Sequence, residues 1–302
     1  MTPEQNYKDL YAKSSFSNRL NMTFFFIKEN YKEILKYMLY FVLPFCLILS
    51  MFGDKTMPFF SEKFENYPEL SQSLVVRTNG LIISIVEAIF GSAFIFFIYV
   101  KKYSEAAKQR LWSEVPTLGK LTVRSLVAFL LVLLAITIGA LPLIFFVAFG
   151  GFALGLISLF IFIPLLIFIF PTTALFTPVY VLENRGVGYS IQKSFKYANK
   201  TWGSTFGIYL LLSIIASMLG LIGSFPYLIM EILKALDIFS GDGINTSTAF
   251  IIFEKIFEAI SLFFTFFFSL IIIVGIMYQY GHAKDTVEHI SEREQIDNFD
   301  SL

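Results

Sequence analysis

The sequence predicts an all-α polytopic membrane protein: a bundle of six transmembrane helices as three hairpins, with amphipathic helices at the cytoplasmic membrane interface. Of its 302 residues, 56% are hydrophobic and 15% are charged, whereas soluble domains carry about 25% charged residues. The apolar residues form six stretches, each long enough, at roughly 20 residues or more, for a helix to cross the hydrocarbon core. The charged residues lie between these stretches.

The positions of the charged residues also predict the orientation. Most of the 23 lysines and arginines fall in the N-terminal segment, in the connections after spans two and four, and in the C-terminal tail. The positive-inside rule then places both termini in the cytoplasm of a multi-pass protein, which we expect in the cytoplasmic (inner) membrane. We expect spans at residues 34–51, 81–100, 121–149, 152–182, 205–232 and 251–280, inside a membrane domain of residues 33–281 that follows a cytoplasmic segment, 1–32, and precedes a polar cytoplasmic tail, 282–302.

An internal repeat explains why the spans pair as hairpins. Pro44, Pro142 and Pro226 lie in the outer halves of spans one, three and five, where we expect helix kinks. The segments before spans one and five also share an apolar helical stripe, although chance similarity between membrane helices is an alternative. The middle copy, at residues 103–122, is degenerate. The two stripes, related by a shift of 171 residues, are Phe16, Leu20, Phe24 and Ile27, and Val187, Ile191, Phe195 and Ala198.

The surface segment before span five is a candidate for contact with lipid headgroups. Lys193, Lys196 and Lys200 lie opposite its apolar stripe. A basic amphipathic helix of this kind lies in the plane of the membrane interface, where its lysines meet anionic lipid. The alternative is that such helices only frame the bundle.

Glu87 is the most informative charge inside a predicted span. At 1.5 Å per residue it lies roughly 9 Å into span two, and an acidic group at the membrane centre costs roughly 3 kcal/mol. Such a residue suggests a functional site, unless the span begins later and Glu87 is interfacial. Glu254 and Glu258, at the outer end of span six, are expected to be hydrated.

Span four contains three prolines, Pro164, Pro171 and Pro178, at intervals of seven residues. A heptad spacing keeps them on one helix face, and each removes a backbone donor and bends the helix. The carbonyl groups that are freed need other donors, for which Thr172, Thr173 and Thr177 are candidates. The span is either a bent helix fitted to its neighbours or a hinge of the kind found in transporters.

Several classes of chemistry have no support in the sequence. It contains two histidines, His282 and His289, without the spacing of a zinc helix, and one cysteine. It has no phosphate-binding loop and no nucleophile elbow. We therefore expect no catalytic residues, no metal and no cofactor, and the zero net charge gives no reason to expect a nucleic-acid partner.

The segment from Pro178 to Lys196 resembles the loop after span four in the glycerophosphodiester phosphodiesterase-type membrane-domain family, a set of bacterial six-span integral membrane proteins. The resemblance extends over residues 15–285. It implies a role in membrane lipid or envelope homeostasis, but no phosphodiesterase activity, because the chain lacks the motif of the soluble catalytic barrel to which some members are fused. The matching positions are Pro178, Glu183, Gly186, Ser190 and Ser194.

The same segment can be interpreted from its chemistry. Glu183 and Arg185 lie just inside the predicted cytoplasmic interface, where Glu183 is placed to cap the following helix. Ser190 and Ser194 are one turn apart, so their hydroxyls can bond to carbonyls of their own helix or to a lipid phosphate. With Lys193, Lys196 and Lys200, these residues form the candidate headgroup site.

The sequence thus favours a non-enzymatic integral membrane protein that acts in lipid or envelope homeostasis or as a scaffold. Its expected partners are membrane lipids and other envelope proteins, and its oligomeric state is not predicted. The alternative is a secondary transporter or lipid-translocating carrier that uses Glu87 and the bent span four. A membrane-embedded hydrolase or transferase is disfavoured by the scarcity of histidine, cysteine and clustered carboxylates.

Overall fold

The chain is all-α over the residues that the computed structural model describes: 8–11, 14–52, 82–103, 112, 114–149, 151–240 and 247–290. Within these residues, six helices are long and apolar enough to cross a membrane, which confirms a multi-pass helical membrane protein. The chain forms two compact units. The first contains Met1–Phe26, Ala88–Leu211 and Ile273–Leu302, and the second contains Ile27–Glu87 and Leu212–Ile272.

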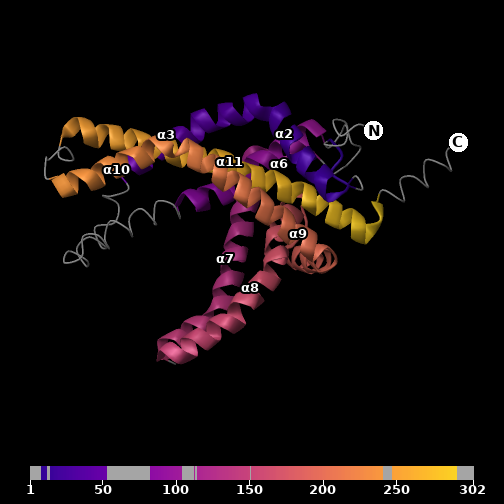
Figure 1. Ribbon diagram of the computed structural model, residues 1–302. Helices are drawn as coiled ribbons and strands as arrows, with labels where there is room; N and C mark the ends of the chain where they lie inside the picture. Colours follow the sequence, from indigo (N-terminus) through magenta and orange to yellow (C-terminus); the bar gives the residue numbers. More distant parts are fainter. Residues whose placement is uncertain are drawn as a thin grey trace. The chain divides into compact units, whose positions relative to one another are not determined.

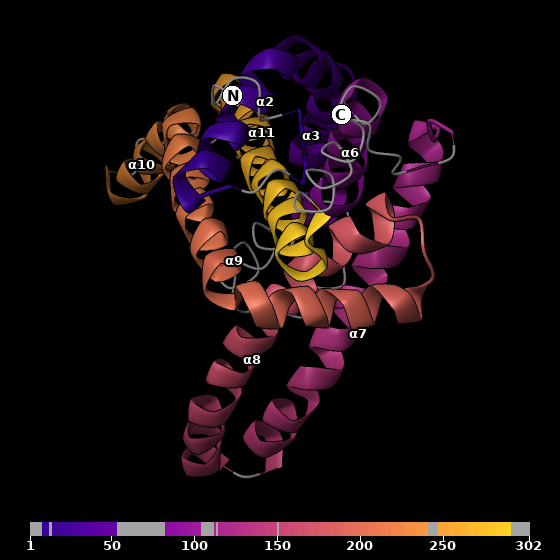
Figure 2. The same cartoon turned by 90° about the vertical axis from the view of Figure 1, so that its right-hand side faces the viewer.

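The first unit contains the hairpin predicted for spans three and four. Helices α7 (Leu118–Phe149) and α8 (Gly151–Leu182) lie side by side, as Figures 1 and 2 show. Pro142 lies inside α7, and α8 contains the other three prolines of the hairpin. The unit also includes α6 (Ser92–Tyr103), whose buried Tyr99 lies near the rings of Phe26 and Tyr278.

The carbonyl groups before Pro171 are served by two different donors. The Thr173 hydroxyl donates to the Phe170 carbonyl at 2.8 Å, as one of the threonines was expected to do. The indole Nε1 of Trp202, on α9 (Val187–Gly223), donates to the Phe168 carbonyl at 3.0 Å. The carbonyl of Phe168 lies in the turn before Pro171, which a proline disturbs. The Trp202 contact was not predicted from the sequence.

Helix α9 combines a surface segment and a span. Its backbone leaves the helical region at Thr201, where φ is −123° and ψ is 24°. Figure 2 shows the axis of α9 turning sharply between its two parts. The bend therefore separates the predicted amphipathic segment, residues 187–200, from the apolar residues that follow.

Span one, which lies mostly in the second unit, belongs to a helix that is longer than predicted. The helical path is continuous through α2 (Phe16–Tyr37), the π-helical η1 (Met38–Val42) and α3 (Leu43–Phe52). The predicted surface helix and span one are thus one continuous helix. Pro44 lies two residues after the end of η1, and the backbone donor that it lacks would have bonded to the carbonyl of Tyr40 inside η1, so the missing donor coincides with a local change of helix type. Span two, Ile82–Tyr103, contains a second π-helical segment, η3 (Glu87–Gly91).

The prediction that span five extends to residue 232 is wrong. Helix α9 ends at Gly223, Ser224 forms a turn, and a separate helix, α10, covers Phe225–Ser240. Pro226 is consequently no kink inside a span. It occupies the first turn of α10, where a missing N–H has no helical partner to lose. A Cβ on Gly223 would lie 2.4 Å from the Phe264 Cβ, so the end of α9 passes α11 (Thr248–Glu288) at very short range.

Glu254 and Glu258 are not hydrated as expected. Lys234 on α10 pairs with Glu254 on α11 at 2.9 Å, and Lys255 pairs with Glu258 at 3.1 Å. Glu258 is buried. Glu254 thus has its lysine partner on α10, whereas the lysine partner of Glu258 lies three residues earlier on α11 itself.

The predicted repeat has a counterpart in the burial of α2 and α9. Thr23 and Ser194, related by the shift of 171 residues, are both fully buried, and each hydroxyl donates to the carbonyl four residues before it. In the stripe predicted for α9, Ile191 and Phe195 are each 53% exposed, whereas Ala198 is buried. The buried pairs at this shift within α2 are Arg19 and Ser190, Thr23 and Ser194, Phe26 and Tyr197, Asn30 and Thr201, Ile34 and Thr205, and Tyr37 and Ile208.

Candidate functional site

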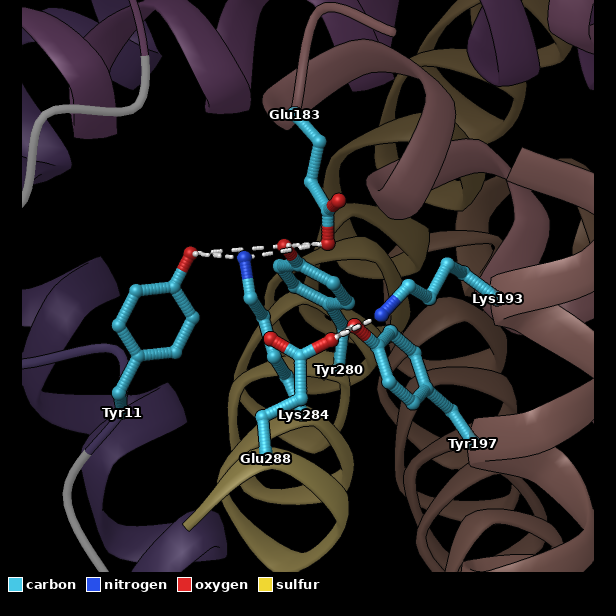
Figure 3. Close-up of polar contacts among 7 residues, drawn as sticks. All are labelled: Tyr11, Glu183, Lys193, Tyr197, Tyr280, Lys284 and Glu288. Atoms are coloured by element: carbon cyan, nitrogen blue, oxygen red, sulfur yellow. Dashed lines mark hydrogen bonds and ion pairs between the residues drawn. The ribbon is translucent and has the colours of Figure 1, made fainter. Parts of the chain in front are cut away.

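A cluster of charged and phenolic side chains joins the end of α8, the end of α11 and the N-terminal segment in the first unit (Figure 3). Glu183 follows the last residue of α8, and its carboxylate accepts a hydrogen bond from the Tyr280 hydroxyl at 2.8 Å. Lys284, one turn further along α11, pairs with the same oxygen at 3.2 Å. The side chains of Glu183 and Lys284 are 6% and 15% exposed. This is therefore a largely buried ion pair with a phenol as its third member.

A second carboxylate extends the cluster to the first part of α9. Glu288, one turn beyond Lys284, pairs with Lys193 and accepts a hydrogen bond from the Tyr197 hydroxyl at 2.7 Å. Tyr197 is fully buried, and its ring lies 6.3 Å from that of Tyr280. The two carboxylates thus bind α9 and the α8–α9 connection to the same face of α11.

The N-terminal segment completes the cluster. The Tyr11 hydroxyl lies 3.3 Å from Lys284 Nζ and 3.4 Å from the Tyr280 hydroxyl. Burial raises the pKa of the Tyr11 phenol, which therefore stays protonated at neutral pH. A Cβ on Gly281 would lie 1.9 Å from the Leu10 carbonyl oxygen, so only glycine allows the segment to lie this close to α11.

An arginine holds the end of α8 in place. Arg124, in the second turn of α7, donates to the carbonyls of Tyr180 and Arg185, the latter at 2.8 Å. Its guanidinium also lies 4.2 Å from the centroid of the Tyr180 ring. The carbonyl groups at a helix C-terminus lack helical partners and carry partial negative charge, which a cation satisfies. Asn184 then leaves the helix with a φ of 51°, which asparagine tolerates better than most residues.

The first part of α9 has three distinct faces. Ser190 and Ser194 are fully buried, and their hydroxyls donate to the carbonyls of Gly186 and Ser190 at 3.0 and 2.6 Å. Of the two roles that the sequence left open for these serines, the structure places them in the bond to their own helix. Ile191 and Phe195 are half exposed on a second face. Lys196 and Lys200 are exposed on a third face, opposite the apolar one.

The sequence predicted part of this arrangement. Glu183 lies at the centre of the cluster, and Arg185 contributes its carbonyl while its side chain is exposed. Lys193 does not lie free beside Lys196 and Lys200, because Glu288 binds it. The tail expected from residue 282 is helical to Glu288 and supplies two cluster members. The residues missed were Tyr11, Tyr197, Tyr280, Lys284 and Glu288, of which the last three follow an i, i+4, i+8 spacing that marks one face of a helix.

Glu87 lies in the other unit. It begins the π-helical segment η3, is partly buried and lies within hydrogen-bonding reach of Ser269 on α11. Arg77, which the sequence offered as a partner, lies outside the described residues. Pro164 and Pro171 belong to the first unit.

Both carboxylates of the cluster are engaged by a lysine and a tyrosine. Among the described residues, no group of three or more His, Cys, Asp or Glu side chains is placed to hold a metal ion. No family model matches the chain, and neither a curated protein nor a solved structure matches it significantly.

Proposed function

We propose that this chain is a non-enzymatic integral protein of a bacterial inner membrane that binds anionic lipid through the first part of α9, in a role in lipid or envelope homeostasis. Both termini lie in the cytoplasm in this proposal. Its principal support is the three-faced helix of residues 187–200. The apolar face, with Ile191 and Phe195, enters the acyl boundary, while Lys196 and Lys200 meet headgroups.

The polar cluster gives this surface a fixed position. A basic helix that is held rigidly loses little conformational freedom when lipid binds, and this favours affinity. The buried face of α9 bonds to itself through Ser190 and Ser194, and to α11 through Tyr197 and Glu288. The resemblance to the glycerophosphodiester phosphodiesterase-type membrane domains, carried by Pro178, Glu183 and Gly186, is compatible with this role.

Lipid that copurifies with two variants tests the proposal. Each lysine contributes about 1 kcal/mol near an anionic leaflet, so Lys196→Gln with Lys200→Gln should reduce bound phosphatidylglycerol by about tenfold or more. The matched control, Lys196→Arg with Lys200→Arg, keeps the charge and should retain the lipid. Native mass spectrometry reports both. Equal lipid in the glutamine and arginine variants would exclude α9 as the contact.

Glu87 supports a second candidate, a secondary transporter or lipid-translocating carrier. Glu87 lies inside a helix that is long and apolar enough to cross a membrane, and an acidic residue in such a helix is the usual setting of a proton-coupled site. This alternative predicts that proteoliposomes show pH-driven proton flux with wild-type protein and none with Glu87→Gln. Flux that is unchanged in Glu87→Gln would remove the candidate.

A further inference from the structure

Helix α10 exposes apolar side chains and keeps its charged side chains away from the surface. Its side chains are described up to Leu236. In this part Glu231 and Lys234 are half-buried, and Lys234 pairs with Glu254 of α11 at 2.9 Å. Every exposed residue of the same part is apolar, and the spacing of three and four residues places them in one stripe. The large residues of this stripe are Phe225, Leu228, Ile229, Ile232, Leu233 and Leu236.

The first part of α11 repeats this arrangement. The Ser261 hydroxyl donates to the hydroxyl of Ser224, just before α10, at 2.7 Å. Lys234, further along α10, reaches Glu254. The two helices therefore run antiparallel and lie side by side (Figure 1). Glu254 is half-buried and Glu258 is buried. Over residues 250–258 the exposed side chains are again apolar: Ile251, Ile252 and Phe253.

This distribution is the reverse of that in a pair of helices surrounded by water. In water, charged side chains face the solvent, because burying a charge costs free energy, and apolar side chains pack between the helices, because burying them gains about 25 cal/mol per Å². A contiguous exposed apolar surface marks contact with a protein or a membrane. Charges that are paired between α10 and α11 beneath such a surface indicate apolar surroundings.

The apolar stripe of α10 continues the exposed face of span five. Leu221 and Ile222, near the end of α9, are 61% and 72% exposed, and Phe225 follows them after a short turn. The part of α9 after Thr201 rises about 33 Å, which is enough to cross a hydrocarbon core about 30 Å thick. Helix α10 therefore begins where span five leaves the core. Its 16 residues are too few to cross the membrane again.

We propose that α10 lies in the acyl region of the leaflet in which span five ends, with its stripe against lipid acyl chains. In an ordinary interfacial helix the charged face meets headgroups, whereas here Lys234 is paired with Glu254. The contact therefore selects acyl chains and not headgroup charge. It differs in this from the surface of residues 187–200, where Lys196 and Lys200 are exposed, and it does not depend on the role proposed for that surface.

The test places a spin label on the stripe in the full-length protein. Ile232→Cys is introduced in a Cys46→Ala background and reconstituted into phosphatidylcholine vesicles with or without phosphatidylglycerol. Collisions of the label with oxygen, which concentrates in the acyl region, are compared with collisions with a water-soluble nickel chelate. The ratio of oxygen to nickel collisions should be severalfold higher than at Glu114→Cys, an exposed position before α7. It should be close to the ratio at Leu221→Cys, on the exposed face of span five.

Three results would overturn the proposal. Nickel access at Ile232 equal to that at Glu114 would place α10 in water. Protection from both reagents would show that protein, such as a second copy of the chain, covers the stripe. A ratio that falls when phosphatidylglycerol is omitted would show that headgroup charge holds the helix. Leu236→Cys, one turn along the stripe, should reproduce the result and guards against a local disturbance at Ile232. Lys196→Gln with Lys200→Gln should leave the ratio unchanged, which separates this proposal from lipid binding by α9.

Discussion

The first parts of α2 and α9 place buried residues at the same positions but differ in the chemistry of those residues. In both, a hydroxyl donates to the carbonyl four residues before it, from Thr23 in α2 and from Ser194 in α9. In both, an aromatic residue three positions later lies against α11. The Phe26 ring is 6.3 Å from that of Tyr278, and the Tyr197 ring is 6.3 Å from that of Tyr280.

The differences lie in charge and in helix geometry. In the first part of α9, the buried serine hydroxyls bond to carbonyls of their own helix, and the Tyr197 hydroxyl bonds to Glu288. The first part of α2 instead buries Arg19. Thr201 bends α9, but α2 remains helical through Asn30, the equivalent position. The comparison teaches that a repeat can retain which positions are buried while the side chains at those positions diverge. The divergent positions are therefore where function is to be sought.

The strongest test of the comparison moves the charge from one copy to the other. Ser190→Arg would bury a guanidinium in a position that is filled by a serine. We expect a loss of stability above about 4 kcal/mol, because an unpaired buried charge and overpacking act together. Unfolding in sodium dodecyl sulfate would measure it. Gln192→Arg, on an exposed position of the same helix, should stay within about 0.5 kcal/mol of wild type.

Disrupting the ion pair between Glu183 and Lys284, which joins the start of α9 to α11, should give the next largest loss of stability. Lys284→Met leaves the Glu183 carboxylate buried without its cation, and removing one partner of a buried pair costs about 3 kcal/mol or more. The double variant Glu183→Gln with Lys284→Met should be less unstable than the two single effects predict. A double-mutant cycle in the same unfolding assay measures this coupling. If the stability change of the double variant equals the sum of the two single changes, the contact contributes nothing to stability.

The contact between α11 and the N-terminal segment that precedes α2 depends on a glycine. Gly281→Ala places a methyl group against the Leu10 carbonyl, so the N-terminal segment must move. We expect a loss of about 1–3 kcal/mol, in the range for overpacking. Gly203→Ala is the matched control, because a Cβ there meets nothing within 4 Å and alanine favours a helix by up to about 1 kcal/mol. Proteolysis near Tyr11 should increase in Gly281→Ala only.

The sequence predicted the helical fold, because hydrophobic length alone determines where a helix can cross a membrane. It also located Glu183 and the lysines of α9, which lie in a polar segment between spans. It did not predict the roles of Tyr280 and Lys284. Both lie at the end of an apolar stretch, where polar residues are expected to face the membrane interface, and their partner Glu183 lies on another helix that the sequence does not place beside them. Span five is predicted to be too long because neither the hydropathy nor the charge of the sequence changes at the turn formed by Ser224.

The smallest expected effect tests whether the two copies are equivalent where they match. Thr23→Val and Ser194→Ala each remove a hydroxyl whose bond to a helix carbonyl is redundant with the backbone bond already made there. Such bonds contribute little and bend helices slightly, so both variants should change stability by less than about 1 kcal/mol. Their effects should also be equal within the error of the unfolding assay. A large loss of stability in Thr23→Val alone would mean that the Thr23 hydroxyl has a role near Arg19 that the Ser194 hydroxyl lacks near Ser190. The first parts of α2 and α9 would then differ at more than the position of the charged residue.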